Sequence, residues 1–387
     1  MGLIREAITT LEDSPIIEVW RMGFTVPDVI GMWAGEPDVP TPPFICEAAS
    51  HALAQGHTFY SPNRGIPELR AALAAYHHRL YGLRIADGRL AITQSGMAAV
   101  MLVAQATLEP GDNVVVVTPT WPNTMRAAQI NGAAVREVSL RRGNAGWTLD
   151  LEALFAQCDA HTRLICFASP GNPTGWVMSR AEGEALLAFA RRRSIALLAD
   201  EVYHRIIYDG DAAFSMLEIA VPDDPVFVVN SFSKAWAMTG WRLGWMVFPD
   251  GLAHEFEKLI QFNTSGTQAF LQYGAIAALN EGEEFVAWFV GRCRKGHAVI
   301  EERLAGIPRV HHIPNNASFY AMFEVDGMAD SLGFCRRAVT EAHIGMAPGI
   351  AFGTGAGRMV RLCYAKAPAL LHEAMDRLAA FVADYRE

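Results

Sequence analysis

Short apolar segments that alternate with helical segments most restrict how this chain can fold. Four segments rich in β-branched and other apolar residues are predicted to be buried strands: 114–117, 164–168, 195–199 and 226–229. Helices are predicted over 67–80, from the spacing of Leu69, Leu73 and Tyr76, and over 96–108. Such alternation produces a mostly parallel sheet with helices on both faces. We therefore predict an α/β fold whose ligand lies beyond the carboxyl ends of the strands.

The pattern of elements changes after residue 282. A long helical segment over 283–305 precedes shorter segments near 319–324 and 359–364, and a helix starts at Pro368. A stretch rich in proline and glycine at 35–43 is typical of an extended crossing between parts of a fold. We predict a large domain over residues 40–285 and a smaller α+β domain built from both ends of the chain, residues 1–39 and 286–387.

Composition restricts the partners and the compartment. The 387 residues are 51% hydrophobic and carry a net charge of −9, without the basic stripe of a nucleic-acid-binding protein. No apolar run approaches the roughly 20 residues that span a bilayer, and residues 1–11 lack the apolar core of a signal peptide. The six cysteines are scattered without metal or redox spacing. We expect a cytoplasmic protein with reduced thiols and no nucleic-acid, membrane or metal partner.

The strongest chemical signal is a lysine that follows the strand predicted at 226–229. Lys234 lies in the string Ser231-Phe232-Ser233-Lys234, and Arg242 follows eight residues later, beside glycines. A partly buried lysine near cations has a lowered pKa and can hold an aldehyde as an imine. Serine hydroxyls and an arginine fork are donors that a phosphate monoester needs. These residues therefore indicate a site for a phosphorylated aldehyde.

Three further clusters follow predicted strands or open a predicted helix. Asp200 and Tyr203 follow the strand at 195–199, where a carboxylate can pair with a protonated ring nitrogen. Asn172 lies in a proline-rich turn after the strand at 164–168, and its amide can bond to two oxygens. Residues 95–97 open a helix, whose free amides can bind phosphate. Each cluster alone also fits an ordinary turn or helix cap, so the hypothesis depends on their combination.

Together these motifs resemble the fold-type I pyridoxal-phosphate enzymes, specifically the class I/II aminotransferases such as aspartate aminotransferase. The resemblance covers nearly the whole chain and includes the spacing of 28 residues from Asn172 to Asp200. It implies pyridoxal 5'-phosphate as cofactor and transfer of an amino group from an L-amino acid to a 2-oxo acid.

The resemblance also implies a role for each residue of the motifs. Lys234 resembles the lysine that forms the Schiff base and shuttles the proton, and Asp200 resembles the partner of the pyridine nitrogen. Tyr203 and Asn172 match the groups on the phenolic oxygen of the cofactor. The residues that match the phosphate-binding cup are Ser95, Gly96, Met97, Ser231, Ser233 and Arg242.

Four other residues match positions that hold the ring, the phosphate or the substrate. Trp121 fits the aromatic residue that stacks on the ring, and Tyr60 resembles a tyrosine that reaches the phosphate of the partner subunit. Arg361 matches the arginine that grips the substrate α-carboxylate, and Gly35 the glycine whose backbone also contacts it. The family's pattern thus implies a homodimer with composite active sites. By the same analogy, cis peptide bonds precede Pro119 and Pro173.

The amino donor is less well defined than the reaction. Relatives specific for dicarboxylates carry an extra arginine near 261–268, and this chain has no cation there. A buried side-chain carboxylate would lack a partner, so we expect no strict dicarboxylate specificity. Arg64 is an alternative cation, or an arginine that anchors a turn. Four aromatic residues are candidate apolar walls of the substrate site: Trp33, Phe24, Phe319 and Phe352.

Three other activities use the same kind of fold. A pyridoxal-phosphate β-lyase shares the lysine and the carboxylate-binding arginine, and would release pyruvate and ammonia without a 2-oxo acid acceptor. An acyl-CoA-condensing enzyme fits the string from Lys234 to Arg242 less well. A regulatory protein that binds the cofactor would carry an appended DNA-binding segment, and the predicted domains fill the chain.

Overall fold

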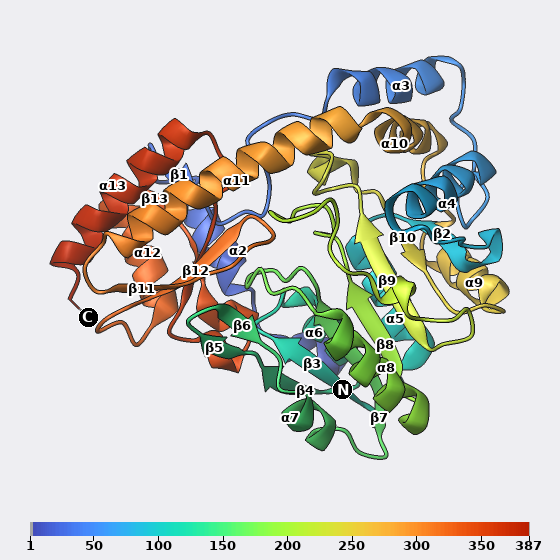
Figure 1. Cartoon of the computed structure of the whole chain (residues 1–387), viewed down its shortest axis with the longest axis horizontal. Helices are drawn as coiled ribbons and strands as arrows, with labels where there is room; N and C mark the ends of the chain where they lie inside the picture. Colours follow the sequence, from blue (N-terminus) through green and yellow to red (C-terminus); the bar gives the residue numbers. More distant parts are fainter. Residues whose placement is uncertain (1–2, 387) are drawn as a thin grey trace.

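A seven-stranded sheet forms the larger half of the molecule (Figure 1). The computed structural model describes residues 3–386, so residues 1, 2 and 387 of the predicted small domain lie outside the described residues. The strands, in their order across the sheet, are β2 (Leu90–Thr93), β10 (Gly244–Val247), β9 (Val226–Ser231), β8 (Ala196–Asp200), β7 (Thr162–Ala168), β3 (Asn113–Thr118) and β4 (Ala134–Ser139). Strand β10 runs antiparallel to both of its neighbours, β2 and β9, and the other neighbouring strands of this sheet run parallel to each other. The predicted α/β fold is confirmed.

Helices cover both faces of this sheet because its strands are apolar on both sides. Along β3, Val115 and Val117 join one hydrophobic core, whereas Val114 and Val116 join another. This alternation is the twofold side-chain period of a strand buried on both faces. The helices of this half are α3 (Pro43–Ala54), α4 (Pro67–Tyr81), α5 (Gly96–Thr107), α6 (Asn123–Ile130), α7 (Leu151–Ala156), α8 (Arg180–Arg193), α9 (Ala253–Thr264) and α10 (Ala269–Glu281). A hairpin of β5 (Arg141–Gly143) and β6 (Gly146–Thr148) lies beside them.

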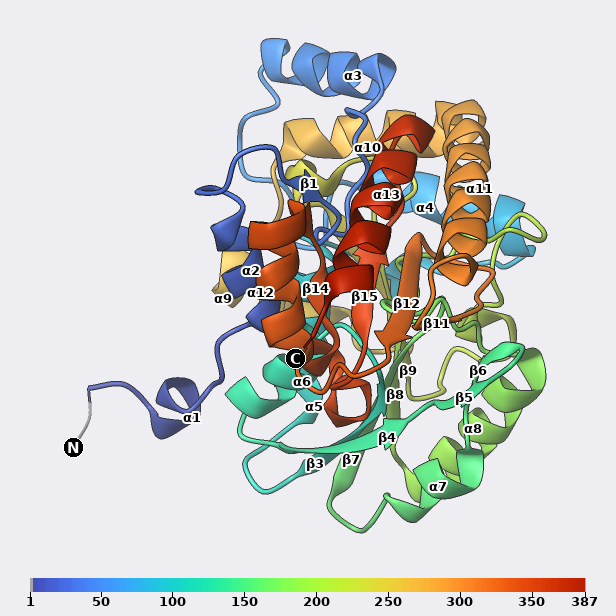
Figure 2. The same ribbon diagram turned by 90° about the vertical axis from the view of Figure 1, so that its left-hand side faces the viewer.

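A second, antiparallel sheet forms the smaller half. Its strands, in order, are β11 (Val310–Ile313), β12 (Tyr320–Val325), β15 (Val360–Cys363) and β14 (Ala347–Pro348). The helices are α11 (Glu283–Ala305), α12 (Ser331–Ala342) and α13 (Pro368–Asp384). The N-terminal segment contributes α1 (Glu6–Thr9), α2 (Pro15–Met22) and β1 (Ile30–Gly31), and β1 pairs with β13 (Ile344–Gly345). Figure 2 shows α2 beside α12, so both ends of the chain meet in this half.

A short backbone ladder links the segment after β8 to the smaller sheet. Ser318 N donates to Ile206 O over 2.7 Å, and Tyr208 N donates to Asn316 O over 3.0 Å. This ladder places the segment after β8 against the start of β12. Short 3₁₀ helices complete the connections, at Asp87–Arg89, Met216–Glu218, Thr239–Trp241, Gly349–Phe352 and Thr354–Ala356. Within residues 3–386, each helix is too short or too polar to cross a membrane.

Candidate active site

A cavity of about 280 Å³ lies at the carboxyl ends of β7, β8 and β9. Eleven of the predicted site residues line it: Gly35, Gly96, Met97, Trp121, Asn172, Asp200, Tyr203, Ser231, Ser233, Lys234 and Arg242. Parallel strands end at the same edge of a sheet, and the loops that follow them converge there. Segments as far apart in the sequence as Gly35 and Arg242 therefore meet around one space.

Lys234 follows β9 and lies at the centre of this cavity. Its Nζ donates to the carbonyl oxygen of Gly35 over 2.7 Å and lies 5.6 Å from the centroid of the Tyr203 ring. Burial lowers the pKa of Lys234 to about 8, and the cations Arg361 and Arg242 contribute in the same direction. A larger share of this amine is therefore neutral near physiological pH, as a nucleophile or base must be.

Asp200 ends β8, is partly buried and lines the cavity. Its carboxylate accepts one hydrogen bond, from Val202 N at 3.2 Å. Burial raises the pKa of Asp200 to about 6, although that bond and Lys234 oppose the effect. The next side chain, Glu201, accepts from Met216 N at 2.9 Å instead, because successive side chains point in opposite directions. Asp200 is thus the strand-end carboxylate available to a cationic group in the cavity.

The phosphate-binding residues predicted from the sequence gather at the start of α5. Ser95 is the N-cap, and its Oγ accepts from Ala98 N at 3.0 Å, so this hydroxyl serves the helix rather than the cavity. Ser231 Oγ donates to Ser233 Oγ over 2.9 Å. Arg242 donates to Thr239 O over 2.7 Å. Hydroxyls, an arginine and free helix amides together suit a phosphate group.

A glycine makes this arrangement possible. A Cβ added to Gly244 would lie 2.6 Å from the backbone nitrogen of Gly96, closer than real Cβ contacts occur. The start of α5 therefore approaches β10 more closely than any other residue type permits. This contact positions the amides at the helix N-terminus beside Ser231.

Arg361 lies behind the cavity wall and is 0% exposed. Its Nη1 donates to Asn172 Oδ1 over 3.0 Å, its Nη2 donates to Trp33 O, and its Nε has no partner. The guanidinium lies 4.5 Å from the Tyr320 ring centroid and 4.9 Å from that of Phe352. Among residues 3–386 it forms no ion pair with a carboxylate. A buried cation without an anion is costly, so this arginine is poised for a carboxylate ligand.

Four residues of the cavity wall were not predicted as site residues: Asn123, Ala168, Val202 and Tyr320. Tyr320 lines the cavity, and its hydroxyl lies 2.5 Å from the hydroxyl of Tyr203. Asn123, at the start of α6, also lines it. The motif around Trp121 could have indicated Asn123, whereas the position of Tyr320 depends on how the two sheets meet.

Three predicted site residues do not line this cavity: Ser95 and Arg361, described above, and Tyr60. Tyr60 is 93% exposed and lines a separate hollow of about 370 Å³, together with Phe59 and residues 264–270. Arg64, the alternative cation, donates to the carbonyl oxygens of Asp87 at 2.9 Å and Leu90 at 3.0 Å. Arg64 therefore anchors a turn and does not reach the cavity.

The prediction that four aromatic residues wall the substrate site is wrong. The indole of Trp33 packs against Gly23, Gly31 and Gly345, where added Cβ atoms would overlap it. Only the carbonyl oxygen of Trp33 points towards the site, and it accepts from Arg361. Phe24 is exposed, whereas Phe319 and Phe352 are buried, and none of them lines the cavity.

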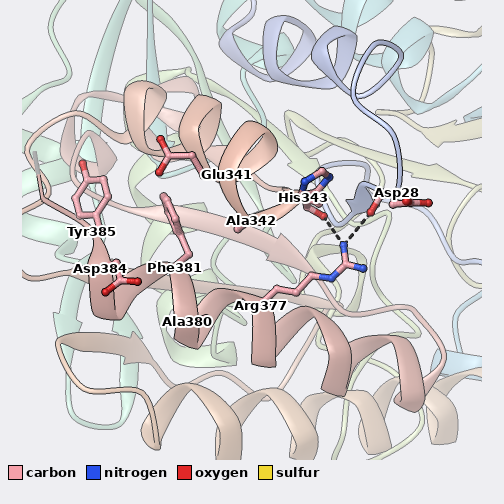
Figure 3. A pocket seen from close by; sticks show the side chains of 9 residues that line it. All are labelled: Asp28, Glu341, Ala342, His343, Arg377, Ala380, Phe381, Asp384 and Tyr385. Carbon is pink, nitrogen blue, oxygen red and sulfur yellow. Dashed lines mark hydrogen bonds between the residues drawn. The ribbon is translucent and has the colours of Figure 1, made fainter.

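A larger hollow of about 530 Å³ lies on the outer side of the smaller half (Figure 3). Three carboxylates line it: Asp28, Glu341 and Asp384. Its single arginine, Arg377, donates to the backbone oxygens of Asp28 at 2.8 Å and His343 at 3.2 Å. The residues that line this hollow include no lysine, and its arginine is engaged by backbone oxygens, so it lacks the residue set of the 280 Å³ cavity.

The two predicted cis peptide bonds are present, at Thr118-Pro119 and Asn172-Pro173, and a third lies at Ser169-Pro170. The fold, the position of the cavity and the residues around it thus define one class of protein: an α/β protein with a lysine of lowered pKa, a group of donors suited to phosphate, and a buried arginine without a carboxylate partner among residues 3–386.

Comparison with known proteins identifies the family. The profile of aminotransferase class I and II matches residues 27–378, and the chain belongs to this family. It is 32% identical to the aspartate aminotransferase of Pyrococcus horikoshii over 97% of this chain and 96% of that one. Aspartate aminotransferase from Thermus thermophilus with maleate has a TM-score of 0.91 at 30% identity, covering 98% and 100% of the two chains. Alanine aminotransferase from Pyrococcus furiosus has a TM-score of 0.91 at 26% identity, covering 99% and 100%. The protein is a pyridoxal-phosphate-dependent aminotransferase.

Proposed function

We propose that Lys234 binds the cofactor covalently and moves the substrate α-proton, within the cavity described above. The observation that carries this proposal is a partly buried amine with a pKa of about 8, beside a partly buried carboxylate and a buried arginine that forms no ion pair among residues 3–386. Lys234→Ala tests it. The variant should lose turnover and the absorbance of covalently held cofactor, while keeping its fold. A variant that transfers amino groups at the normal rate would refute it.

The residues around the cavity fit the parts of pyridoxal phosphate. We assign the phosphate to the helix amides of Gly96 and Met97 and to the side chains of Ser231, Ser233 and Arg242. Ser95 supports this site by capping α5. Trp121 lines the cavity where it can stack on a ring, and Asn172 and Tyr203 supply donors for a phenolic oxygen.

Four residues act in the proposed proton transfer. When bound, the cofactor withdraws electrons from the substrate Cα, which makes its proton removable. As a free amine, Lys234 would take that proton from Cα and would return it to the carbon that was the aldehyde carbon of the cofactor. Asp200 keeps a ring nitrogen of the cofactor protonated. An ionised carboxylate and an adjacent cation stabilise each other, so each charge favours the other. Arg361 and the backbone of Gly35 orient the substrate carboxylate, which fixes the direction of the Cα–H bond.

We propose an L-amino acid donor without strict dependence on a second carboxylate. Within residues 3–386, the cavity lining contains two cations, Lys234 and Arg242, and both are assigned to the cofactor. Relatives are named aspartate, aspartate/prephenate and alanine aminotransferases, so this fold serves several donors. A donor panel without 2-oxo acid tests the proposal. Conversion by aspartate and glutamate alone would refute it.

We further propose a homodimer with composite sites. Phe59, Tyr60 and Phe262 are 84%, 93% and 81% exposed, which is unusual for aromatic residues of a folded chain. The hollow that Tyr60 lines adjoins Gln94, two residues before α5. Tyr60→Phe should weaken cofactor binding without changing the fold, and Phe59→Leu should leave it unchanged. Equal affinity of Tyr60→Phe and the wild type would exclude Tyr60 from the site.

The remaining expectations concern organisation and compartment. We propose that residues 40–285 act as one domain and residues 1–39 with 286–387 as the other, with the second boundary inside α11. A cytoplasmic location is supported by six cysteines that are free thiols. The comparisons do not favour the β-lyase alternative, since the matched relatives are aminotransferases.

A further inference from the structure

Tyr320 contacts three residues assigned to the cofactor or the substrate. Its hydroxyl oxygen lies 2.5 Å from that of Tyr203, and its ring faces the guanidinium of Arg361 at 4.5 Å. A Cβ on Gly35 would overlap the Tyr320 hydroxyl, so glycine at that position makes room for it. Tyr320 is 0% exposed and belongs to β12, the strand paired with the β15 strand that carries Arg361. It therefore connects the substrate side of the cavity to the cofactor side.

The number of hydrogens decides how the two hydroxyls interact. Each phenol has one hydrogen to donate. If Tyr203 donated to Tyr320, it would have none left for an acceptor in the cavity. If Tyr320 donates to Tyr203, the Tyr203 hydrogen remains free to point into the cavity that it lines. The Arg361 cation favours the second arrangement, because a nearby positive charge makes the Tyr320 phenol the better donor.

We propose that Tyr320 is a positioning residue that donates to Tyr203 and so directs the Tyr203 hydrogen to the phenolic oxygen of the cofactor, while its ring supports Arg361. This inference rests on the proposed function, in which Tyr203 faces that oxygen. A hydrogen bond accepted by a phenol strengthens the bond that the same phenol donates. Tyr320 therefore adjusts the charge on the cofactor through its hydrogen bond to Tyr203.

Tyr320→Phe separates the two roles of this side chain. The variant loses the hydroxyl and keeps the ring below Arg361, so the KM for the amino acid should stay within about twofold. The readout is the pH at which the absorbance of bound cofactor changes by half, measured without substrate. We expect this midpoint to rise by about 0.5–1 pH unit, from the usual contribution of one neutral hydrogen bond. Without the Tyr320 hydroxyl, Tyr203 is a weaker donor and leaves more negative charge on the phenolic oxygen of the cofactor. This charge holds the titrating proton beside it more tightly, so the midpoint rises.

Tyr364→Phe is the matched control. Tyr364 is also 0% exposed and also belongs to a pair of tyrosine hydroxyls, 3.0 Å from Tyr208, but it does not line the cavity. Its loss should leave the midpoint unchanged. A third variant, Tyr320→Leu, removes the ring as well, and should raise the KM for the amino acid by about fivefold or more in addition to the shift.

Three results decide between the interpretations. A shift in Tyr320→Phe, together with none in Tyr364→Phe, supports the inference. No shift in Tyr320→Phe, or equal shifts in both variants, overturns it while leaving the aminotransferase assignment intact. A wild-type protein that shows no cofactor absorbance overturns the assignment of Lys234 itself, so the two failures are distinguishable.

Discussion

Replacing Arg361 by lysine tests how the substrate carboxylate is bound. The guanidinium is held by Asn172 and by the Trp33 carbonyl oxygen, and its Nε is unpartnered. Lysine keeps the charge but cannot donate two parallel hydrogen bonds to a carboxylate. A hydrogen bond to a charged group contributes about 1.5–3 kcal/mol. Loss of one such bond, about 2–3 kcal/mol, corresponds to a fall of about 30- to 150-fold in kcat/KM.

The assay compares two donors on each enzyme. The first is the best amino acid of the donor panel, and the second is the amine that has the same side chain and no carboxylate. Arg361→Lys should lower kcat/KM for the amino acid by the stated factor and leave the slow reaction of the amine within about threefold. Equal losses for both donors would show that Arg361 supports the fold rather than the carboxylate, and the reasoning would fail.

Three further predictions follow from the same cavity. Gly244→Ala should weaken pyridoxal-phosphate binding by about 5- to 150-fold, because its Cβ displaces Gly96. The control Gly240→Ala, which has open space around it, should leave binding unchanged. Equal affinities of the two variants, measured by cofactor titration, would contradict the proposed phosphate site at the start of α5. Asp200→Asn should stabilise the cofactor-free protein by up to about 3 kcal/mol at pH 7.5, because the native pKa is raised from 3.8 to about 6. This advantage should shrink as the pH falls through about 6 and should disappear below about 3.8, where the wild-type carboxyl is protonated in both states; urea unfolding that shows no pH-dependent difference would contradict it. The rate of cofactor capture should rise with pH around a midpoint near 8, where Lys234 becomes neutral, and a rate independent of pH between 6.5 and 9.5 would contradict the lowered pKa.

Much of the fold could be predicted because its signals are local. The helix expected over 283–305 is α11, which glycines flank on both sides. The strand expected at 195–199 is shifted by one residue, because Asp200 continues the ladder and pairs with Val229. Strands β2, β4 and β10 of the large sheet were not predicted. None of them has the continuous β-branched or apolar run that marked the predicted strands, because β2 and β10 are short and mixed in composition and β4 contains Arg136 and Glu137.

The residues of the site also divide into those that could be predicted from the sequence and those that could not. Lys234, Asp200 and Asn172 could be predicted because each follows a strand, and strand ends converge in a parallel sheet. The contact of Tyr320 with Tyr203 could not, since it depends on how the smaller sheet lies against the segment after β8. Trp33 misled the prediction because its neighbour Gly35 does line the cavity. Its backbone oxygen, not its ring, faces Arg361.

The most direct test of the central claim is the absorbance of the purified protein with pyridoxal phosphate, before and after single L-amino acids without a 2-oxo acid. We predict a yellow band that depends on Lys234 and that certain amino acids convert to the amino form of the cofactor. A band that persists while pyruvate and ammonia accumulate would contradict amino transfer. A protein that shows no band even with added cofactor would contradict the assignment of Lys234 and, with it, the whole site.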